Sequence, residues 1–343
     1  MHIHQITKYV CFVFCDMFLL DDACNKQERV EMCSSSTQTV QRNLQLLSAK
    51  LFVLEPKTIH YYTGLETYEK FCMVLSSLGR AAHELNYFLD HAPTLSVEDQ
   101  FFLTLIKLRV HPPHQELSIM FGINLKEVTN IFVTWINFMF LQWSEVNWWP
   151  SRELTSYFMP HDFKKAYPKT RVIVDGTECP IHKPSQPVAQ QATFSSYKNR
   201  NTIKVVVGST PGGLVSYISP AFGGSASDRQ IVEKTSLPKR FDPYDEVMAD
   251  KGFNVDDIFM PYKVGINMPH FFQKKNRLSN ATVLKDRKVA SKRVHIERVI
   301  GLAKTYKILR HPMNNMESSL GSQIITVCFL LCNFRNCIVS TDA

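Results

Sequence analysis

The sequence offers little support for a membrane protein, a secreted disulfide scaffold or a zinc-finger protein. Its first apolar stretch, residues 9–20, contains Asp16 and is too short to span a bilayer. This stretch faintly resembles a signal-peptide core, but nothing downstream is typical of secretion. The nine cysteines are odd in number and irregularly spaced, and Cys11 and Cys15 lack a later zinc-binding pair. We therefore expect no membrane association, and reduced thiols in an intracellular compartment.

No internal repeat is visible, and the composition is that of an ordinary globular chain. The 343 residues are 45% hydrophobic and 20% charged, which allows a sizeable core and two domains. The net charge is +8, yet residues 250–310 alone hold 14 lysines and arginines against 5 acids. Such a basic segment indicates a polyanionic partner, although a solvated charged helix face would have the same composition.

The first half of the chain is predicted to be helical. Residues 1–55 lack clear periodicity and form a poorly defined N-terminal segment, whereas residues 60–150 show helical spacing. Ser96 is placed to cap a helix with acids in its first turn, and Pro112-Pro113 would end that helix. We expect an all-α module over residues 60–150.

Within this module, residues 115–140 have the spacing of a helix-turn-helix. A short helix, a turn at Gly122 and a longer helix follow one another, with Ser118 as the small residue and Val128 as the apolar anchor. A helical packing unit that touches no DNA would have the same pattern, and the second helix carries few cations. If the unit does read a DNA groove, its second helix would present three polar residues, Lys126, Thr129 and Asn130.

After Pro168 the pattern changes to strands separated by helices. The strands are predicted over residues 172–174, 202–208, 214–219 and 246–249, and helices over residues 228–234 and 290–307. Three strands in a meander, then helix, strand and helix, is the order of an α/β RNase H-like fold with a mixed sheet flanked by helices. We assign this domain to residues 165–315. A C-terminal helix over residues 316–343 would bury three cysteines, Cys328, Cys332 and Cys337.

Three acids are placed where this fold could bring them together. Asp175 follows the first predicted strand, Asp250 follows the fourth, and Glu297 lies in the last helix. On neighbouring strands the two aspartates would be adjacent, and two or three carboxylates can hold two Mg²⁺ ions over a phosphodiester. Each acid also has a simpler explanation: the aspartates precede or approach glycine turns, and Glu297 can pair with Arg293.

Further residues extend this candidate site. Asp228 is a fourth acid, which either caps its helix or lies near the metal ions. Arg293, Glu297 and Lys304 are spaced by four and seven residues, so they share one helix face, with a cation on each side of the carboxylate to contact phosphates. Six more cations extend a basic track ahead of this helix: Lys274, Lys275, Arg277, Lys285, Arg287 and Lys288.

Five ordered motifs carry a resemblance to a known family: Val174-Asp175-Gly176-Thr177-Glu178, Tyr197-Lys198 with Lys204, Gly223-Gly224-Ser225-Ala226-Ser227-Asp228, Ala249-Asp250-Lys251-Gly252-Phe253 and Val294-His295-Ile296-Glu297-Arg298-Val299-Ile300-Gly301. Over residues 60–315 the chain resembles PIF/Harbinger-type transposases with a DDE endonuclease domain, of the kind found beside THAP-type zinc fingers and in Harbinger-derived nucleases. Residues 62–65 and 95–143 resemble the helix-turn-helix module of that family.

The resemblance implies an RNase H-like fold, Mg²⁺ or Mn²⁺, and cut-and-paste DNA transposition in the nucleus, with some protein in the cytoplasm. It places the catalytic triad on Asp175, Asp250 and Glu297 and a further metal ligand on Asp228. It also implies homo-oligomers on DNA and a Myb-like accessory protein. Two departures are visible, since no THAP zinc finger is present and Ala290 stands where related insertion-sequence transposases have tyrosine.

Two alternatives stay open. A host-adopted derivative would bind DNA or protein as a nuclear factor without cleavage. A metallophosphoesterase would use histidines, but His182, His270 and His295 have no ligand-cluster spacing.

Overall fold

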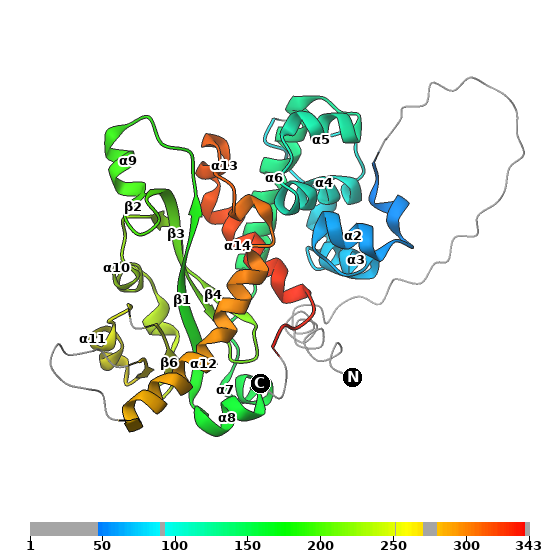
Figure 1. Cartoon of the computed structure of the whole chain (residues 1–343). Helices are drawn as coiled ribbons and strands as arrows, with labels where there is room; N and C mark the ends of the chain where they lie inside the picture. Colours follow the sequence, from blue (N-terminus) through cyan, green and yellow to red (C-terminus); the bar gives the residue numbers. More distant parts are fainter. Residues whose placement is uncertain (1–46, 90–92, 251, 270–279, 340–343) are drawn as a thin grey trace, which may run out of the picture.

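The computed structural model describes residues 47–89, 93–250, 252–269 and 280–339. A helical unit stands beside a twisted sheet, and the long helices α6 and α14 lie between them (Figure 1). Within the described ranges, no helix has the length and apolar character needed to cross a bilayer. Most of the predicted N-terminal segment, residues 1–55, lies outside the described residues.

The helical unit confirms the predicted helix starts and turn. It comprises the short 3₁₀ turns Ala49–Phe52 and Arg80–His83 and the helices α2 (Pro56–Thr63), α3 (Tyr68–Ser76), α4 (Val97–Arg109), α5 (His114–Phe121) and α6 (Leu125–Ser144). The Ser96 side chain accepts a hydrogen bond from the Asp99 amide and so caps α4. Gly122 has a φ of 64°, the left-handed conformation that ends α5 and turns the chain toward α6.

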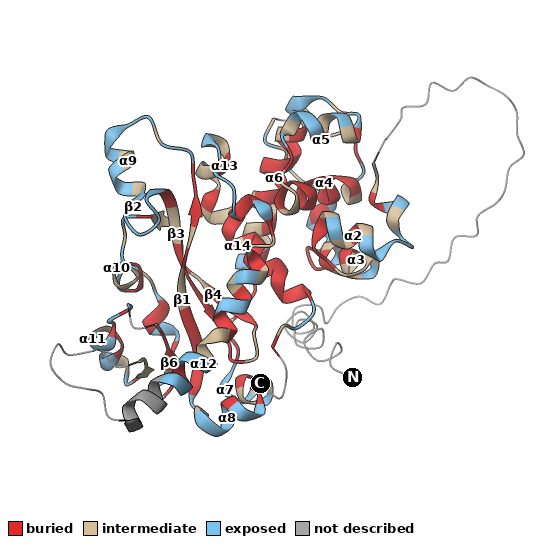
Figure 2. Cartoon of the chain, viewed as in Figure 1, coloured by how far each residue is buried: buried red, intermediate tan, exposed pale blue. Residues whose placement is uncertain are grey.

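Helix α6 is mainly a packing helix. It extends four residues beyond the predicted end at residue 140, and beyond its first turn its apolar residues Ile131, Trp135, Met139 and Trp143 are fully buried. It packs against α4 and against α14 (Gly321–Leu331). Figure 2 shows this buried seam continuing from the helical unit to the sheet. The helix-turn-helix unit therefore shares one hydrophobic core with the following domain.

The sheet has the strand order expected of an RNase H-like fold. Its strands are β1 (Thr170–Pro180), β2 (Phe194–Ser195), β3 (Arg200–Ser209), β4 (Val215–Ile218), β5 (Phe222–Gly223), β6 (Glu246–Met248) and β7 (Gly265–Asn267). β3 is antiparallel to β1 and carries β2, β4 and β5 along its outer edge. β6 and β7 continue the sheet on the other side of β1, parallel to it. This mixed sheet confirms the predicted fold class and adds three short strands, β2, β5 and β7.

Helices surround the sheet. They are α7 (Arg152–Tyr157), α8 (His161–Ala166), α9 (Pro187–Thr193), α10 (Asp228–Glu233), α11 (Asp256–Phe259) and α12 (Asn280–Ala303), with 3₁₀ turns at Leu237–Arg240, Met260–Tyr262 and Lys307–Leu309. Alternate residues of β1 face opposite sides, as the pleat requires. Ile173 packs in the core that contains α12 and α14, whereas Val172 and Val174 pack in a second core with α10.

The C-terminal region departs from the predicted single helix. It forms α13 (Asn315–Ser319), α14 and a 3₁₀ turn over Cys332–Phe334. Cys328 and Cys332 are buried, as predicted, but Cys337 is exposed. That prediction was wrong because Arg335 takes an extended conformation, and residues beyond it no longer follow the buried helix face.

Candidate active site

Of the two predicted aspartates, one lies on β1 and the other lies just after β6, the parallel strand beside it. Asp175 is in the middle of β1, which runs on to Pro180, so the prediction that it ends the strand was wrong. The register pairs Ile173 with Met248, the last residue of β6. Two residues further along each chain segment come Asp175 and Asp250, so Asp250 lies just past the end of β6. Since Asp175 has the same parity as Ile173, it points to the sheet face that α12 covers.

Helix α12 places Arg293 and Glu297 over these aspartates. The Arg293 guanidinium lies 2.9 Å from Asp250 Oδ1 through Nη1 and donates a 2.7 Å hydrogen bond to Glu297 Oε1 through Nη2. The arginine side chain is only 14% exposed, whereas both carboxylates are about half exposed. Arg293 therefore bridges two of the three predicted catalytic acids, and the predicted ion pair of Glu297 exists.

Asp228 approaches from the opposite side of the sheet. It is the first residue of α10, and the cap is Ser227, which forms a capping box with Gln230. The Asp228 carboxylate lies 3.1 Å from Lys204 Nζ. It also lies against Gly176, where a Cβ would stand only 2.2 Å from Asp228 Oδ1. Of the two alternatives for Asp228, the helix cap is therefore wrong, because Ser227 is the cap. Gly176 provides the space for the Asp228 carboxylate.

The electrostatics of the site are dominated by the burial of Asp175. Burial raises the pKa of the Asp175 carboxyl to about 6, against the opposing effects of Arg293 and of the Gly176 amide, which donates a 2.9 Å hydrogen bond to it. The charges of Asp250 and Asp228 raise this pKa further. The negative charges of Asp175, Asp250 and Asp228 thus repel one another, and a bound proton or cation would reduce this repulsion.

Lys304 lies seven residues beyond Glu297 and is partly buried. Burial lowers the pKa of its ammonium, and the neighbouring charges that act on it are those of Cys179, Lys198, Glu178 and Asp175. Its predicted place beside the acids is therefore consistent with the structure. Lys204, which the sequence offered only as part of a motif, is an additional cation next to Asp228.

The donor set suits a hard divalent ion, although the described carboxylates do not form a closed cage. Carboxylate oxygens are the ligands that Mg²⁺ and Mn²⁺ prefer. Within the described ranges, no three histidine, cysteine or acidic side chains converge closely enough to hold an ion. The acids stay apart because the Arg293 guanidinium lies between Asp250 and Glu297, and because Asp228 lies on the other side of Gly176.

Two of the predicted groove-reading residues on α6 have other partners. Asn130 is buried, and its side-chain oxygen accepts a 2.8 Å hydrogen bond from the Leu89 amide. Thr129 is half-buried, donates to the Leu125 carbonyl and contacts His114 Nδ1 at 3.1 Å. The prediction that Asn130 points outward was wrong, because this part of α6 packs against other helices. Thr129 stays half-exposed. Lys126 is exposed on the first turn.

The basic track is described only in part. Arg287 and Lys288 are exposed on α12. Four of the predicted track residues lie outside the described residues or have undescribed side chains: Lys274, Lys275, Arg277 and Lys285.

Of the three histidines, His182 and His295 lie among the described residues, and their surroundings differ. His270 lies outside the described residues, and His182 is exposed. His295 is buried, with Nδ1 3.0 Å from the Pro211 carbonyl, so it belongs to the core. The histidine-based phosphoesterase therefore has no support in this geometry.

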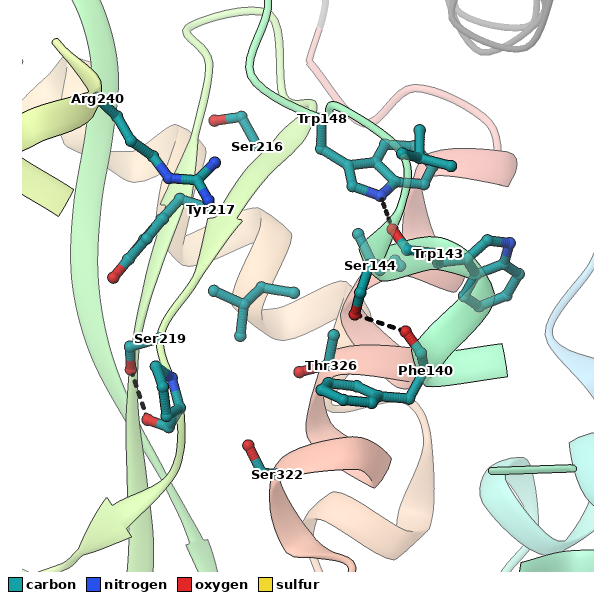
Figure 3. A pocket seen from close by; sticks show the side chains of 14 residues that line it. Phe140, Trp143, Ser144, Trp148, Ser216, Tyr217, Ser219, Arg240, Ser322 and Thr326 are labelled. Atoms are coloured by element: carbon teal, nitrogen blue, oxygen red, sulfur yellow. Dashed lines mark hydrogen bonds between the residues drawn. The ribbon is translucent and has the colours of Figure 1, made fainter. Parts of the chain in front are cut away.

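A separate hollow lies between α6, α14 and β4 (Figure 3). Its polar groups are largely used within the protein: Trp148 Nε1 donates to the Trp143 carbonyl, and Ser144 Oγ donates to the Phe140 carbonyl. Arg240 is the one charged residue in its lining, and no acid lines it. This hollow belongs to the junction between the helical unit and the sheet.

The fold is an RNase H-like α/β domain preceded by a helix-turn-helix, with carboxylates gathered at its central strands. Residues 174–333 match the family model of the DDE superfamily endonuclease, and residues 93–145 match that of the helix-turn-helix of DDE superfamily endonuclease. No curated protein matches the chain. Together the two models cover more than half of the sequence, and the chain belongs to the DDE superfamily of transposase-type endonucleases.

Proposed function

We propose that this chain is a metal-dependent DNA endonuclease of the cut-and-paste transposase type, which nicks transposon ends and joins them to target DNA. The observation that carries the proposal is that Asp175 on β1 and Asp250 just past β6 are close enough for their charges to interact, beside the helix that presents Glu297. A partly buried carboxylate with a raised pKa in such a cluster is typical of a catalytic site.

Asp175, Asp250 and Glu297 would hold Mg²⁺ or Mn²⁺, and Asp228 is the further ligand that the resemblance implies. When bound, the ions would stabilise the negative charge of the phosphodiester and of the attacking water or 3′-hydroxyl. Arg293 and Lys304 would hold DNA phosphates on either side of Glu297. For Arg293 to do so, its guanidinium would exchange the carboxylates of Asp250 and Glu297 for a phosphate oxygen.

The partners and the location follow from the same proposal. DNA would contact the exposed first turn of α6 through Lys126 and the exposed cations of α12. We also propose homo-oligomers on DNA, a Myb-like accessory protein and a nuclear location, with some protein in the cytoplasm.

A second function is a host-adopted DNA- or protein-binding factor without cleavage. The observation that favours it is the bridge from Arg293 to Asp250 and Glu297, which already occupies two of the acids that a catalytic metal would need.

One experiment separates the two functions. The native chain, Asp175→Ala and Glu297→Ala are incubated with supercoiled DNA and with terminal-repeat DNA in Mg²⁺ or Mn²⁺, and nicked product is measured on gels. We expect nicking by the native chain and at least about a hundredfold loss in both variants. Asp162→Ala, an exposed acid on α8, is the matched control and should nick normally.

Cleavage that persists in both site variants would overturn the assignment of the acids. A native chain that binds DNA and leaves it uncut in both metals would favour the adopted binding factor.

A further inference from the structure

Residues of α9, β2 and β3 line a groove. These elements lie at the end of the sheet away from α11 (Figure 1). The volume of the groove is about 640 Å³. Its lining combines one aromatic ring, four side-chain amides and two cations without any acid, from Phe194, Gln190, Gln191, Asn199, Asn201, Lys183 and Arg200. This combination is chemically distinct from the carboxylate site.

The walls of the groove are held by specific hydrogen bonds. Asn201 Nδ2 donates to the Gln190 carbonyl at 2.9 Å and to Thr193 Oγ1 at 2.8 Å, which fixes α9 to β3. Gln190 Nε2 donates to the Pro184 carbonyl. The groove is therefore formed in the free protein and needs little ordering to bind a ligand.

Two glycines allow this close approach. A Cβ on Gly223 would stand 2.1 Å from the Ala192 carbonyl oxygen, and a Cβ on Gly224 would stand 2.0 Å from Thr202 Oγ1 and 2.8 Å from the Thr193 carbonyl oxygen. The glycine pair of the Gly223–Asp228 motif thus serves to seat α9. The same motif ends at Asp228, so it connects the groove to the acidic cluster along the backbone.

The charge around the groove favours an anion. The sequence contains no acid from residue 179 to residue 227. Lys183 and Arg200 are exposed at the groove, and neither forms an ion pair within the described part of the chain. Cations without carboxylate partners next to an aromatic ring are typical of surfaces that bind single-stranded nucleic acid.

The groove lies along the same strand pair as Asp175. β3 pairs Val207 with Asp175, and Asn201 lies six residues before Val207 in β3. At about 3.3 Å per residue this separation is roughly 20 Å, or about six nucleotides of a DNA strand at 3.4 Å each. Lys198 lies near this path, since its charge acts on Lys304. A DNA strand at the acids can therefore reach the groove.

We propose that this groove binds one unpaired nucleotide of the DNA substrate, about 20 Å from the carboxylates. The Phe194 ring would stack on the base, the amides of Gln190, Gln191 and Asn199 would hydrogen-bond its edge, and Arg200 with Lys183 would contact the flanking phosphates. A base within a duplex exposes neither face, so the site selects unpaired DNA. The inference rests on the proposed function only in taking DNA as the substrate.

The test measures binding without catalysis. Fluorescence anisotropy in EDTA compares a single-stranded oligonucleotide with a duplex of the same length, for the native chain, Phe194→Ala, Phe194→Trp and Arg200→Ala. We expect Phe194→Ala to weaken single-strand binding about tenfold and Phe194→Trp to restore it, with duplex binding changed less than about twofold. Tyr157→Ala, which removes an exposed ring on α7, is the matched control and should bind as the native chain does.

Circular dichroism checks that each variant is folded, and the partly exposed Phe194 ring tolerates replacement better than a buried one would. The proposal is overturned if the native chain does not prefer the single strand, if Phe194→Ala binds it normally, or if an acidic peptide displaces it at equal concentration. Because nicking is assayed separately with metal, an inactive chain that still shows the Phe194 effect would contradict the proposed function and leave this inference standing.

Discussion

At the scale of single residues, the site has more carboxylates than cations to balance them. Asp175 is desolvated and is flanked by Asp250 and Asp228, while Arg293 is shared between Asp250 and Glu297. Such an arrangement is costly for the folded protein and is typical of functional sites, where stability is lower than packing alone would give. Because the pKa of Asp175 is raised, the loss of stability can be measured as a dependence of unfolding on pH.

We predict that Asp175→Asn stabilises the protein at pH 7 without divalent metal by roughly 1–3 kcal/mol. The folded pKa, about 6, lies above the ordinary value of 3.8, so the native protein loses stability as pH rises between these values and the amide variant does not. Urea unfolding at pH 4 and pH 7 checks this. Asp162→Asn should match the native chain at both pH values, and an Asp175→Asn variant less stable than native at pH 7 would contradict the prediction.

At the scale of elements, one helix serves two purposes along its length. The first turn of α6 is exposed at Lys126, while the following turns are buried against α4 and α14. The buried part explains why Asn130 bonds to a backbone amide and cannot reach a DNA groove. We therefore expect substitutions in the first turn of α6 to change DNA affinity, and substitutions in its buried turns to change the stability of the fold.

We predict that Lys126→Ala weakens duplex binding and reduces the salt slope by about one unit, because one phosphate contact is lost. Asn130→Ala should instead lower the free energy of unfolding by roughly 1–3 kcal/mol, since it leaves the Leu89 amide unpaired, with unchanged affinity. Anisotropy at several salt concentrations and urea unfolding measure the two effects. Lys165→Ala on α8 is the control cation, and an equal loss of affinity in that variant would show that Lys126 has no specific contact.

At the scale of the whole molecule, a buried ion pair joins the helical unit to the C-terminal helices. Lys107 Nζ of α4 lies 2.8 Å from Glu317 Oε1 of α13, and both side chains are almost fully buried. His111 Nε2 contacts the same oxygen at 3.0 Å. Although burial alone would raise the pKa of Glu317, the hydrogen bond from His111 and the charge of Lys107 lower it to about 2.

We predict that Glu317→Gln lowers the free energy of unfolding at pH 7 by about 3–5 kcal/mol, because Lys107 stays buried without its partner. The folded pKa lies below the ordinary value of 4.5, so the native protein keeps this contribution above pH 4.5 and loses it as pH falls toward 2. Denaturant unfolding across this range should show that loss in the native chain and not in the variant. Glu116→Gln, an exposed acid on α5, is the control; a Glu317→Gln variant as stable as native would refute the prediction.

The sequence by itself determined the fold class and the positions of the principal acids, because both depend on local pattern. Hydrophobic alternation, the Ser96 cap and the Gly122 turn give the elements, and the strand order then makes Asp175 and Asp250 neighbours. Only the tertiary structure decided which face each side chain occupies and which charges meet. The burial of Asn130, the bridge through Arg293, the approach of Asp228 across Gly176 and the groove at Phe194 all depend on contacts between distant segments. Local spacing cannot specify such contacts, since they are fixed by packing between elements.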